Sequence, residues 1–169
     1  MSDDIFVSQP DGHCLAELYI GLAFDDLDTP TMADFMKALD KVNRIADRTP
    51  DFVWRLQDEA GNATGVKYSE NPREIVNFSV WQTSADSEHY VWNRVHRQFM
   101  KRRADWFVPL DQPYFVLWWV PVGVLHTLAE ALDCLAWLRS DGHRLMPFAG
   151  PICSVNGFGI SLSQWHQTD

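Results

Sequence analysis

The order of strand-like and helix-like stretches along the chain predicts an α+β domain with the ferredoxin-like arrangement. Stretches rich in β-branched and aromatic residues alternate with stretches of helical spacing in the order β-α-β-β-α-β, and one extra helix follows. The composition agrees, because 169 residues with 46% apolar and 22% charged residues are typical of one globular domain. Helices on one side of an antiparallel sheet leave its other face bare, so we expect two copies to pair as a homodimer.

The domain is expected to span residues 13–141. Residues 1–12 are mostly polar and contain a Pro and a Gly, which predicts a flexible N-terminal arm. Residues 142–169 hold clusters of Pro and Gly without a clear period, which predicts a C-terminal tail of uncertain structure.

The first strand and the first helix follow from local signals. Residues 14–21 read as a strand. Thr29 is a fair N-cap and Pro30 suits the first helical position, so we expect a helix to begin there. The helix should end at Thr49, because the residue before a Pro avoids the helical region. Its apolar residues recur at helical spacing: Met32, Phe35, Met36, Leu39, Val42 and Ala46.

The rest of the domain is predicted to hold three more strands and two more helices. The expected strands are Phe52–Leu56, Ile75–Trp81 and Tyr114–Val120. The expected helices are Ser84–Phe107, broken near Asn93, and Thr127–Arg139, with Gly142 just past the end of the second.

Charge and cysteine usage exclude several classes of function. The net charge of −9 argues against a nucleic-acid partner, which needs cationic surface. The three cysteines match neither a paired disulfide framework nor a zinc motif, and the histidines share no ligand spacing, so we expect no metal. No apolar run reaches the length of a membrane span, and the Met-Ser-Asp-Asp start is not that of a signal peptide. We therefore expect a cytoplasmic protein without a membrane partner.

The eight tryptophans, gathered in two segments with polar residues among them, indicate a small-molecule pocket. In the segment 77–81, Asn77, Ser79 and Trp81 alternate and therefore share one face of a strand. That face is less apolar than a core face should be. We interpret it as a pocket wall in which Asn77 donates a hydrogen bond to a ligand oxygen, although Asn77 pairing with neighbouring backbone would give the same pattern.

The long helix carries a second candidate wall. Trp92, His96, Phe99, Arg103 and Trp106 lie close to a three-to-four spacing, so one stripe presents aromatic rings, an imidazole and a guanidinium. His96 could move a proton, and Arg103 could hold an oxyanion. The alternatives are a hydrogen-bonded core histidine and an arginine paired with Asp105 or Glu17.

Further residues are assigned to the pocket or kept out of it. Tyr19, Arg55 and Glu17 line the same cavity if their strand faces coincide. Trp118 and its neighbour Trp119 point to opposite faces, so only one of them reaches the pocket. The substrate-binding set is Tyr19, Arg55, Trp92, Phe99 and Trp118. The basic run from Arg94 to Arg103 reads mainly as a solvated helix face.

Several of these segments together resemble a known family. They are Phe52–Gln57, Gly61-Asn62, Val76–Trp81, His96-Arg97, Arg102–Phe107 and Leu117–Pro121. Over about residues 13–140 the chain is similar to a bacterial family of domains of unknown function. That family belongs to the dimeric α+β-barrel superfamily, beside the antibiotic-biosynthesis monooxygenases. The resemblance implies a ferredoxin-like subunit and a dimer whose sheets form a barrel.

The resemblance also implies site residues. The cofactor-independent anthrone-type monooxygenases of this superfamily carry an Asn and a Trp four residues apart near a strand end, as Asn77 and Trp81 are here. The haem-degrading branch uses an Asn, a Trp and a helical His, for which Trp92 and His96 are candidates with a poorly matching separation.

Three hypotheses follow. The first is an enzyme for an aromatic or polyketide-like small molecule, working without a cofactor by oxygenation or proton transfer, with Asn77, Trp81, His96 and Arg103 as its catalytic set. The second is haem binding or degradation with His96 as the axial ligand. The third is a non-catalytic small-molecule-binding module. Convergence of the four side chains on one cavity favours the first two.

Overall fold

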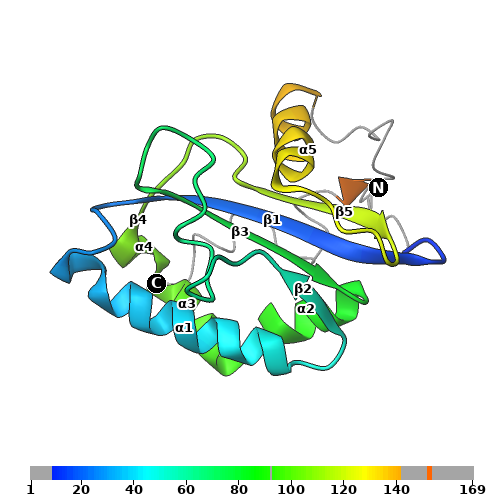
Figure 1. Ribbon diagram of the computed structural model, residues 1–169, viewed down its shortest axis with the longest axis horizontal. Helices are drawn as coiled ribbons and strands as arrows, with labels where there is room; N and C mark the ends of the chain where they lie inside the picture. The colour runs from blue at the N-terminus through cyan, green and yellow to red at the C-terminus, as the bar shows by residue number, and fades with distance from the viewer. Residues whose placement is uncertain (1–8, 92, 142–151, 154–169) are drawn as a thin grey trace, which may run out of the picture.

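An antiparallel sheet forms the middle layer of the protein (Figure 1), whose computed structural model describes residues 9–91, 93–141 and 152–153. Its strands are β1 (His13–Ala23), β2 (Phe52–Arg55), β3 (Glu74–Trp81), β4 (Phe107–Val108), β5 (Phe115–Pro121) and β6 (Ile152–Cys153). The order is β2-β3-β1-β5-β6, and β4 pairs with β1. The four long strands thus follow the ferredoxin-like order, and the predicted α+β class is confirmed.

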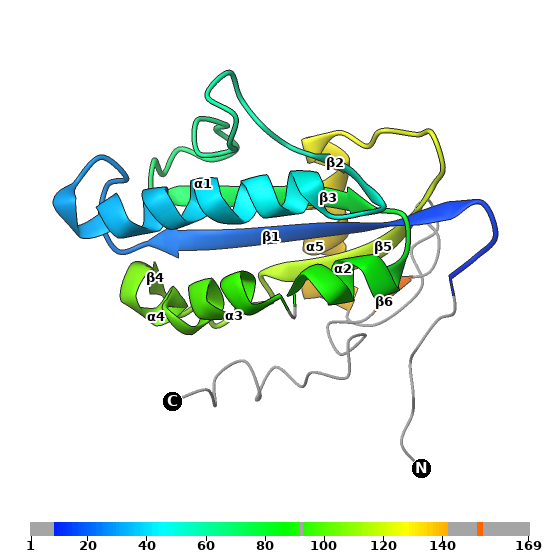
Figure 2. The ribbon, with the colours of Figure 1, turned by 90° about the horizontal axis from the view of Figure 1, so that it is seen from below.

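Helices cover both faces of this sheet. On one face lie α1 (Ala33–Arg48), preceded by the 3₁₀ turn Pro30–Met32, and the series α2 (Ser84–Val91), α3 (Arg94–Lys101) and α4 (Arg103–Trp106). Seen from that side, α1 runs along one flank of β1 and α2 to α4 run along the other (Figure 2). The helix α5 (Leu128–Asp141) lies on the opposite face.

The start of the first helix differs from its prediction in the capping contact. Thr29 has the extended backbone of an N-cap, but its hydroxyl donates to the Asp26 carbonyl at 2.8 Å instead of accepting from the helix. The helix therefore opens with one 3₁₀ turn at Pro30. Its end is as predicted, since Thr49 is extended before Pro50.

The predicted break near Asn93 is confirmed and has a local cause. The Asn93 side chain accepts a hydrogen bond from the Val95 N–H at 3.0 Å and so caps the start of α3. The region expected as a helix broken near Asn93 is three short helices, and Phe107, its expected end, begins β4.

The sheet face expected to be bare is covered by the chain itself. Residues of α5 and of the β2–β3 connection pack on Ala16, Leu18 and Phe78. The contacts from α5 come from Ala131, Cys134, Leu135 and Leu138, and those from the connection come from Leu56, Val66 and Tyr68. The structural reason given for a sheet-to-sheet dimer is therefore wrong, and the homodimer stays a prediction.

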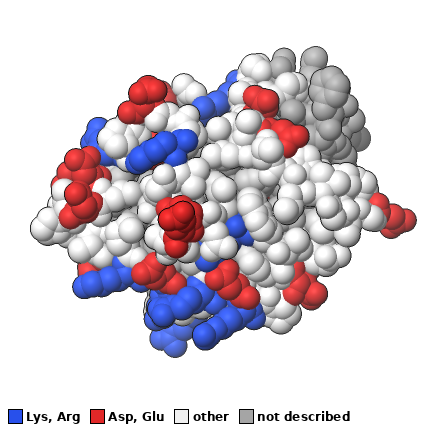
Figure 3. Space-filling view, viewed as in Figure 1, with Lys and Arg blue, Asp and Glu red and all other residues white. Residues whose placement is uncertain are grey.

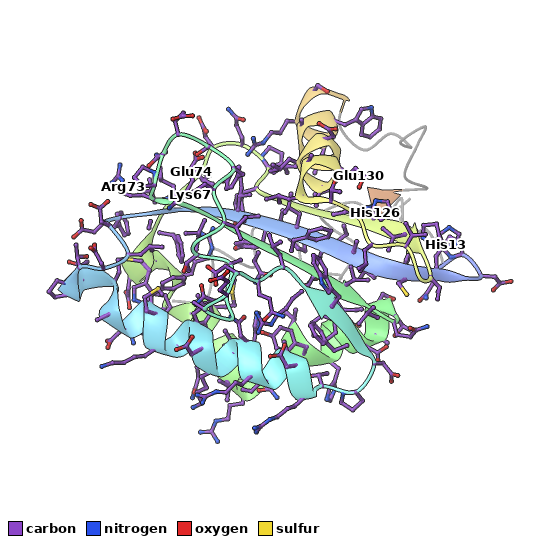
Figure 4. All side chains as sticks on the ribbon, in the orientation of Figure 1. His13, Lys67, Arg73, Glu74, His126 and Glu130 are labelled. Atoms are coloured by element: carbon purple, nitrogen blue, oxygen red, sulfur yellow. The ribbon has the colours of Figure 1, made fainter. Side chains whose placement is uncertain are left out.

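The N-terminus of α5 carries a capping box. The Thr127 N–H donates to a Glu130 carboxylate oxygen at 2.7 Å, and the Glu130 N–H donates to Thr127 Oγ1 at 3.2 Å. His126 lies beside Glu130, with 3.8 Å between Nδ1 and Oε2 (Figure 4). No helix among the described residues is both long and apolar enough to cross a membrane.

The register of β1 decides which side chains face α1 to α4. Glu17 lies opposite Ser79 of β3 and Leu117 of β5, while Tyr19 lies opposite Asn77 and Phe115. Side chains alternate along a strand, so all of these share the face toward α1 to α4.

Gly21 occupies the next position of that face. A Cβ added there would lie 2.9 Å from the Phe107 ring, so the missing side chain is what lets β4 and α4 close over this end of β1.

Candidate functional site

A cavity of about 130 Å³ lies between the sheet and the helices α1, α2 and α3. The sheet contributes Glu17, Tyr19, Asn77 and Ser79, and α3 contributes His96 and Phe99. Most of the remaining wall is aromatic or aliphatic: Ala46, Phe52, Trp81, Tyr90, Val91, Met100, Tyr114 and Phe115. Apolar walls with a few polar groups are typical of small-molecule sites. An engineered cavity of about 150 Å³ holds a benzene molecule. The cavity here is close to that size, which suits one aromatic ring.

A second cavity of about 80 Å³ adjoins the first along the sheet. The two share Tyr19, Asn43, Arg55, Asn77, Phe99 and Met100, and Arg103 lines only the second. Three of the four predicted catalytic residues therefore meet in one cavity, and the fourth lies in its neighbour.

Glu17 is the polar centre of the first cavity. Its carboxylate accepts hydrogen bonds from Ser79 Oγ at 2.9 Å, Trp81 Nε1 at 3.0 Å and Ser87 Oγ at 3.0 Å. Burial raises the pKa of Glu17 above its ordinary value, and the hydrogen bonds from Ser79, Ser87 and Trp81 oppose part of that rise. A carboxylate with a raised pKa is a stronger base than an ordinary carboxylate.

Trp81 is held against the wall by other rings. Tyr90 stacks on it with ring centroids 4.9 Å apart, and Phe52 meets it edge-on at 5.1 Å. Only 1% of Trp81 is exposed, so its indole N–H serves Glu17 and little of its ring surface is left for a ligand. Tyr90 donates its hydroxyl to the Val42 carbonyl at 3.2 Å and so ties α2 to α1.

His96 faces the cavity in a defined tautomer. Its Nδ1 lies 3.1 Å from the Val91 carbonyl oxygen, and because a carbonyl only accepts, Nδ1 carries the proton. Nε2 is then the atom with a free lone pair. Burial lowers the pKa of His96 to about 4, against the smaller opposing effect of the Val91 hydrogen bond. His96 is therefore a neutral acceptor at neutral pH.

Asn77 lines both cavities with its amide unpaired. The side chain is exposed, and no hydrogen bond to it is found among the described residues. Pairing with neighbouring backbone, the alternative considered from the sequence, is absent there. Its amide can both donate to and accept from a ligand.

Arg103 is enclosed by aromatic rings. Its guanidinium carbon lies 4.7 Å from the Tyr114 ring centroid, 5.1 Å from that of Tyr19 and 5.4 Å from that of Phe107. Burial raises the pKa of Tyr19 well above its usual value, although the positive charge of Arg103 opposes the rise. The pairing with Asp105 or Glu17 considered from the sequence is wrong, because Asp105 pairs with Arg102 at 3.1 Å.

The remaining predicted residues divide into three groups. Tyr19, Arg55 and Phe99 line both cavities, and Asp47 holds Arg55 through two hydrogen bonds of 2.7 and 3.0 Å. Trp118 is wrongly assigned to the pocket. It lies opposite Ala16 and packs in the core beneath α5, on the other side of the sheet. Trp92 lies outside the described residues.

From the sequence, Glu17 was only a possible lining residue of the cavity, and Ser87 and Tyr90 were not considered as site residues. A carboxylate between Leu15 and Tyr19 in the middle of an apolar strand was the available signal, since a charge on a core face needs partners. Ser87 and Tyr90 carried no signal, because their importance depends on where α2 crosses the sheet.

Charge is unevenly distributed on the surface. Basic side chains gather below the sheet, where α1 and α3 lie (Figure 3). The exposed ones on these helices are Lys37, Lys41, Arg44, Arg48, Arg94, Arg97 and Lys101, and Arg102 follows the end of α3. The predicted solvated face of the basic run is thus confirmed for all but Arg103. Within the part of the chain that is described, no three His, Cys, Asp or Glu side chains are grouped to hold a metal ion.

A family model described as "Domain of unknown function (DUF3291)" matches residues 14–149. Among curated protein sequences, none matches this chain.

Solved structures with a related arrangement are distant in sequence. A protein of unknown function from Nitrosomonas europaea has 13% identity and a TM-score of 0.45, covering 70% of this chain and 97% of its own. SnoaB, a cofactor-independent oxygenase from Streptomyces nogalater, has 11% identity and a TM-score of 0.45, covering 69% of this chain and 97% of its own. A protein from Shewanella oneidensis has 7% identity and a TM-score of 0.46, covering 65% and 91%.

Proposed function

The chain belongs to the DUF3291 family, and from its cavity we propose that it is an enzyme that removes a proton from a small aromatic molecule. The observation that carries the proposal is the buried Glu17 carboxyl, held by three donors at the wall of an aromatic cavity. A raised pKa brings this group toward the range in which a general base works best at neutral pH.

Glu17 is a better base than His96 for this step. His96 was the expected proton acceptor, but a pKa of about 4 makes its imidazole a weak base. In the proposal His96 accepts a hydrogen bond from a substrate hydroxyl through Nε2. Asn77 donates to the oxygen that gains negative charge as the proton leaves.

Trp81 is a positioning residue in this scheme. Its N–H fixes the Glu17 carboxylate, and Tyr90 and Phe52 hold its ring in place. The rings of Phe99, Phe115 and Tyr114 are left to contact the substrate ring.

Proton removal can be followed by oxygenation. Loss of a proton from a CH₂ group next to an aromatic ring gives a carbanion, which molecular oxygen can attack. The balance is R₂CH₂ + O₂ → R₂C=O + H₂O, and it requires no further reductant. In its more specific form, the proposal is that the enzyme is a cofactor-independent oxygenase.

One observation favours haem binding. A histidine whose Nδ1–H donates to a backbone carbonyl, as in His96, is the usual arrangement for a metal ligand at Nε2. The cavity does not fit a porphyrin, because about 130 Å³ is below the roughly 300–1,000 Å³ of pockets that enclose much smaller drug-sized ligands. The aromatic small molecule is therefore the better-supported ligand.

The test uses 2-tetralone, a two-ring ketone with acidic benzylic protons. Proton abstraction is followed as hydrogen–deuterium exchange in D₂O by NMR, and oxygenation is followed as oxygen uptake. Exchange that Glu17→Gln abolishes and the surface control Glu88→Gln retains would support the proposal. Equal exchange in all three proteins would exclude Glu17 as the base, and binding without exchange would indicate a binding module.

A further inference from the structure

We propose that the substrate is an aromatic carboxylate, that Arg103 binds its charged group, and that Glu17 faces its reacting end. This inference rests on the proposed function, because it names the substrate class of the same cavity. It depends on the missing counter-charge of Arg103, on the shape of the joined cavities and on the charge around them.

The partly buried side chain of Arg103 has one buried donor without an acceptor. The Nη2 atom is buried and makes no hydrogen bond within the described part of the chain. Three aromatic rings surround the guanidinium carbon within 5.4 Å and exclude much of the water that would otherwise solvate it. A buried donor without a partner is unfavourable, and a buried charge without one is more so.

No salt bridge joins Arg103 to a carboxylate among the described residues. Asp105 and Asp34 both pair with Arg102 on the surface, at 3.1 and 3.3 Å. Glu17 is held by Ser79, Trp81 and Ser87. A carboxylate from a ligand matches the planar guanidinium and would form the short, charge-assisted hydrogen bonds that Arg103 lacks.

The adjoining cavities place Arg103 and Glu17 along the same face of β1. Arg103 lines the second cavity and lies over Tyr19, which is two residues from Glu17 along β1. Two residues of a strand span about 7 Å, which is the length of one aromatic ring with a substituent. In the proposal, a ring in the first cavity extends its carboxylate into the second, toward Arg103.

The helices that wall the cavities carry positive charge on their outer faces. Exposed lysines and arginines of α1 and α3 gather on this side of a protein whose net charge is −9. A local positive region attracts an anionic ligand toward the cavities even where the overall charge does not.

The test compares binding of 2-naphthoate and 2-naphthamide, which share a ring system and differ in charge. Affinities are measured by titration calorimetry on the full chain, for the wild type, Arg103→Gln and Arg94→Gln. Arg94 is an exposed residue of α3, so its variant removes the same charge from the surface. We expect naphthoate to bind at least about tenfold more tightly than naphthamide in the wild type and in Arg94→Gln, and about equally in Arg103→Gln.

Three results would overturn the inference. The first is equal affinity for the two probes in the wild type, and the second is no binding of either at millimolar concentration. Neither of these depends on a variant that folds. The third is a preference for naphthoate that survives in Arg103→Gln. Because binding is measured without turnover, a carboxylate preference without proton exchange would remove the proposed reaction and leave the assignment of Arg103 standing.

Discussion

The indole N–H of Trp81 donates a hydrogen bond to Glu17 Oε1 across the β1–β3 pair, at 3.0 Å. The contact joins the conspicuous aromatic motif of the sequence to a carboxylate that the motif alone does not reveal. Through this hydrogen bond, Trp81 fixes the orientation of a buried carboxylate.

Replacing Glu17 by Gln should abolish most turnover while keeping the fold. The amide retains the shape and an acceptor for Trp81, but it cannot take a proton, so we expect turnover of an exchangeable substrate to fall by roughly 10²–10⁴-fold. The measurement is the exchange rate at saturating substrate beside a circular dichroism spectrum. A Glu17→Gln protein with native spectrum and full turnover would contradict the assignment.

The same variant should change how stability depends on pH. The pKa of Glu17 is raised in the folded state, so its contribution to stability is fully present below the unfolded value of about 4.5 and is lost as the pH rises through the folded value. Glu17→Gln has no such loss. The free energy of unfolding, measured with urea across this pH range, should rise for the variant relative to the wild type as the pH rises. A difference between the two proteins that does not change with pH would count against a raised pKa.

His96 should give the stability of the protein a pH dependence of the opposite sign. Its pKa of about 4 in the folded protein lies below the unfolded value of 6.5, so its contribution is present above pH 6.5 and is lost as the pH falls toward 4. At about 1.4 kcal/mol per pKa unit, the loss reaches up to about 3 kcal/mol. His96→Gln should remove this dependence, whereas His89→Gln, at an exposed position of α2, should retain it. A titration of His96 near pH 6.5 by NMR would refute the expectation.

Ser87→Ala should move the acid limb of the pH–rate profile to higher pH. The Ser87 hydroxyl donates to Glu17 Oε2 and lowers the pKa of that carboxyl, so its removal leaves the burial effect less opposed. Ser84→Ala, three residues earlier on α2, serves as the control. A limb that stays in place or moves to lower pH would show that Glu17 does not set it.

The parts of the site that could be predicted from the sequence are those that depend on residues close together in the chain. The break at Asn93 was predictable because an N-cap acts on residues next to it. Asn77 and Trp81 were correctly placed on a common face because strands alternate. Alternation also showed that Trp118 and Trp119 point apart, but only the pairing of Trp118 with Ala16 decides which side of the sheet it takes.

Glu17 illustrates what local patterns omit. Its three donors come from the middle of β3, the end of β3 and the helix α2, the last of these 70 residues away in the chain. A single carboxylate in an apolar strand signals that partners exist, but it does not say which they are. The cover on the far face was not predicted, for a related reason. The helix α5 was predicted, but its position over the sheet depends on contacts distant in the chain, and the long β2–β3 connection showed no periodic pattern.

Gly21→Ala should destabilise the protein in a way that a second change relieves. The added Cβ would lie 2.9 Å from the Phe107 ring, and overpacking of this kind costs about 1–3 kcal/mol. In the background of Phe107→Leu the same substitution should cost clearly less, because the smaller side chain leaves room. The free energies of unfolding of the four proteins form a double-mutant cycle, and purely additive effects would contradict the close contact.

The pairing of β1 with both of its neighbours also bears on how this chain can change by insertion or deletion. Glu17, Tyr19 and Gly21 face the cavities only because they occupy alternate positions of one strand, while Ala16 and Leu18 fill the core on the other side. A slip of one residue would exchange these sets, bringing a carboxylate beneath α5 and methyl groups into the cavity. Gains and losses of single residues should therefore be tolerated in the β2–β3 connection and not within β1, where the same register specifies both the core and the acid.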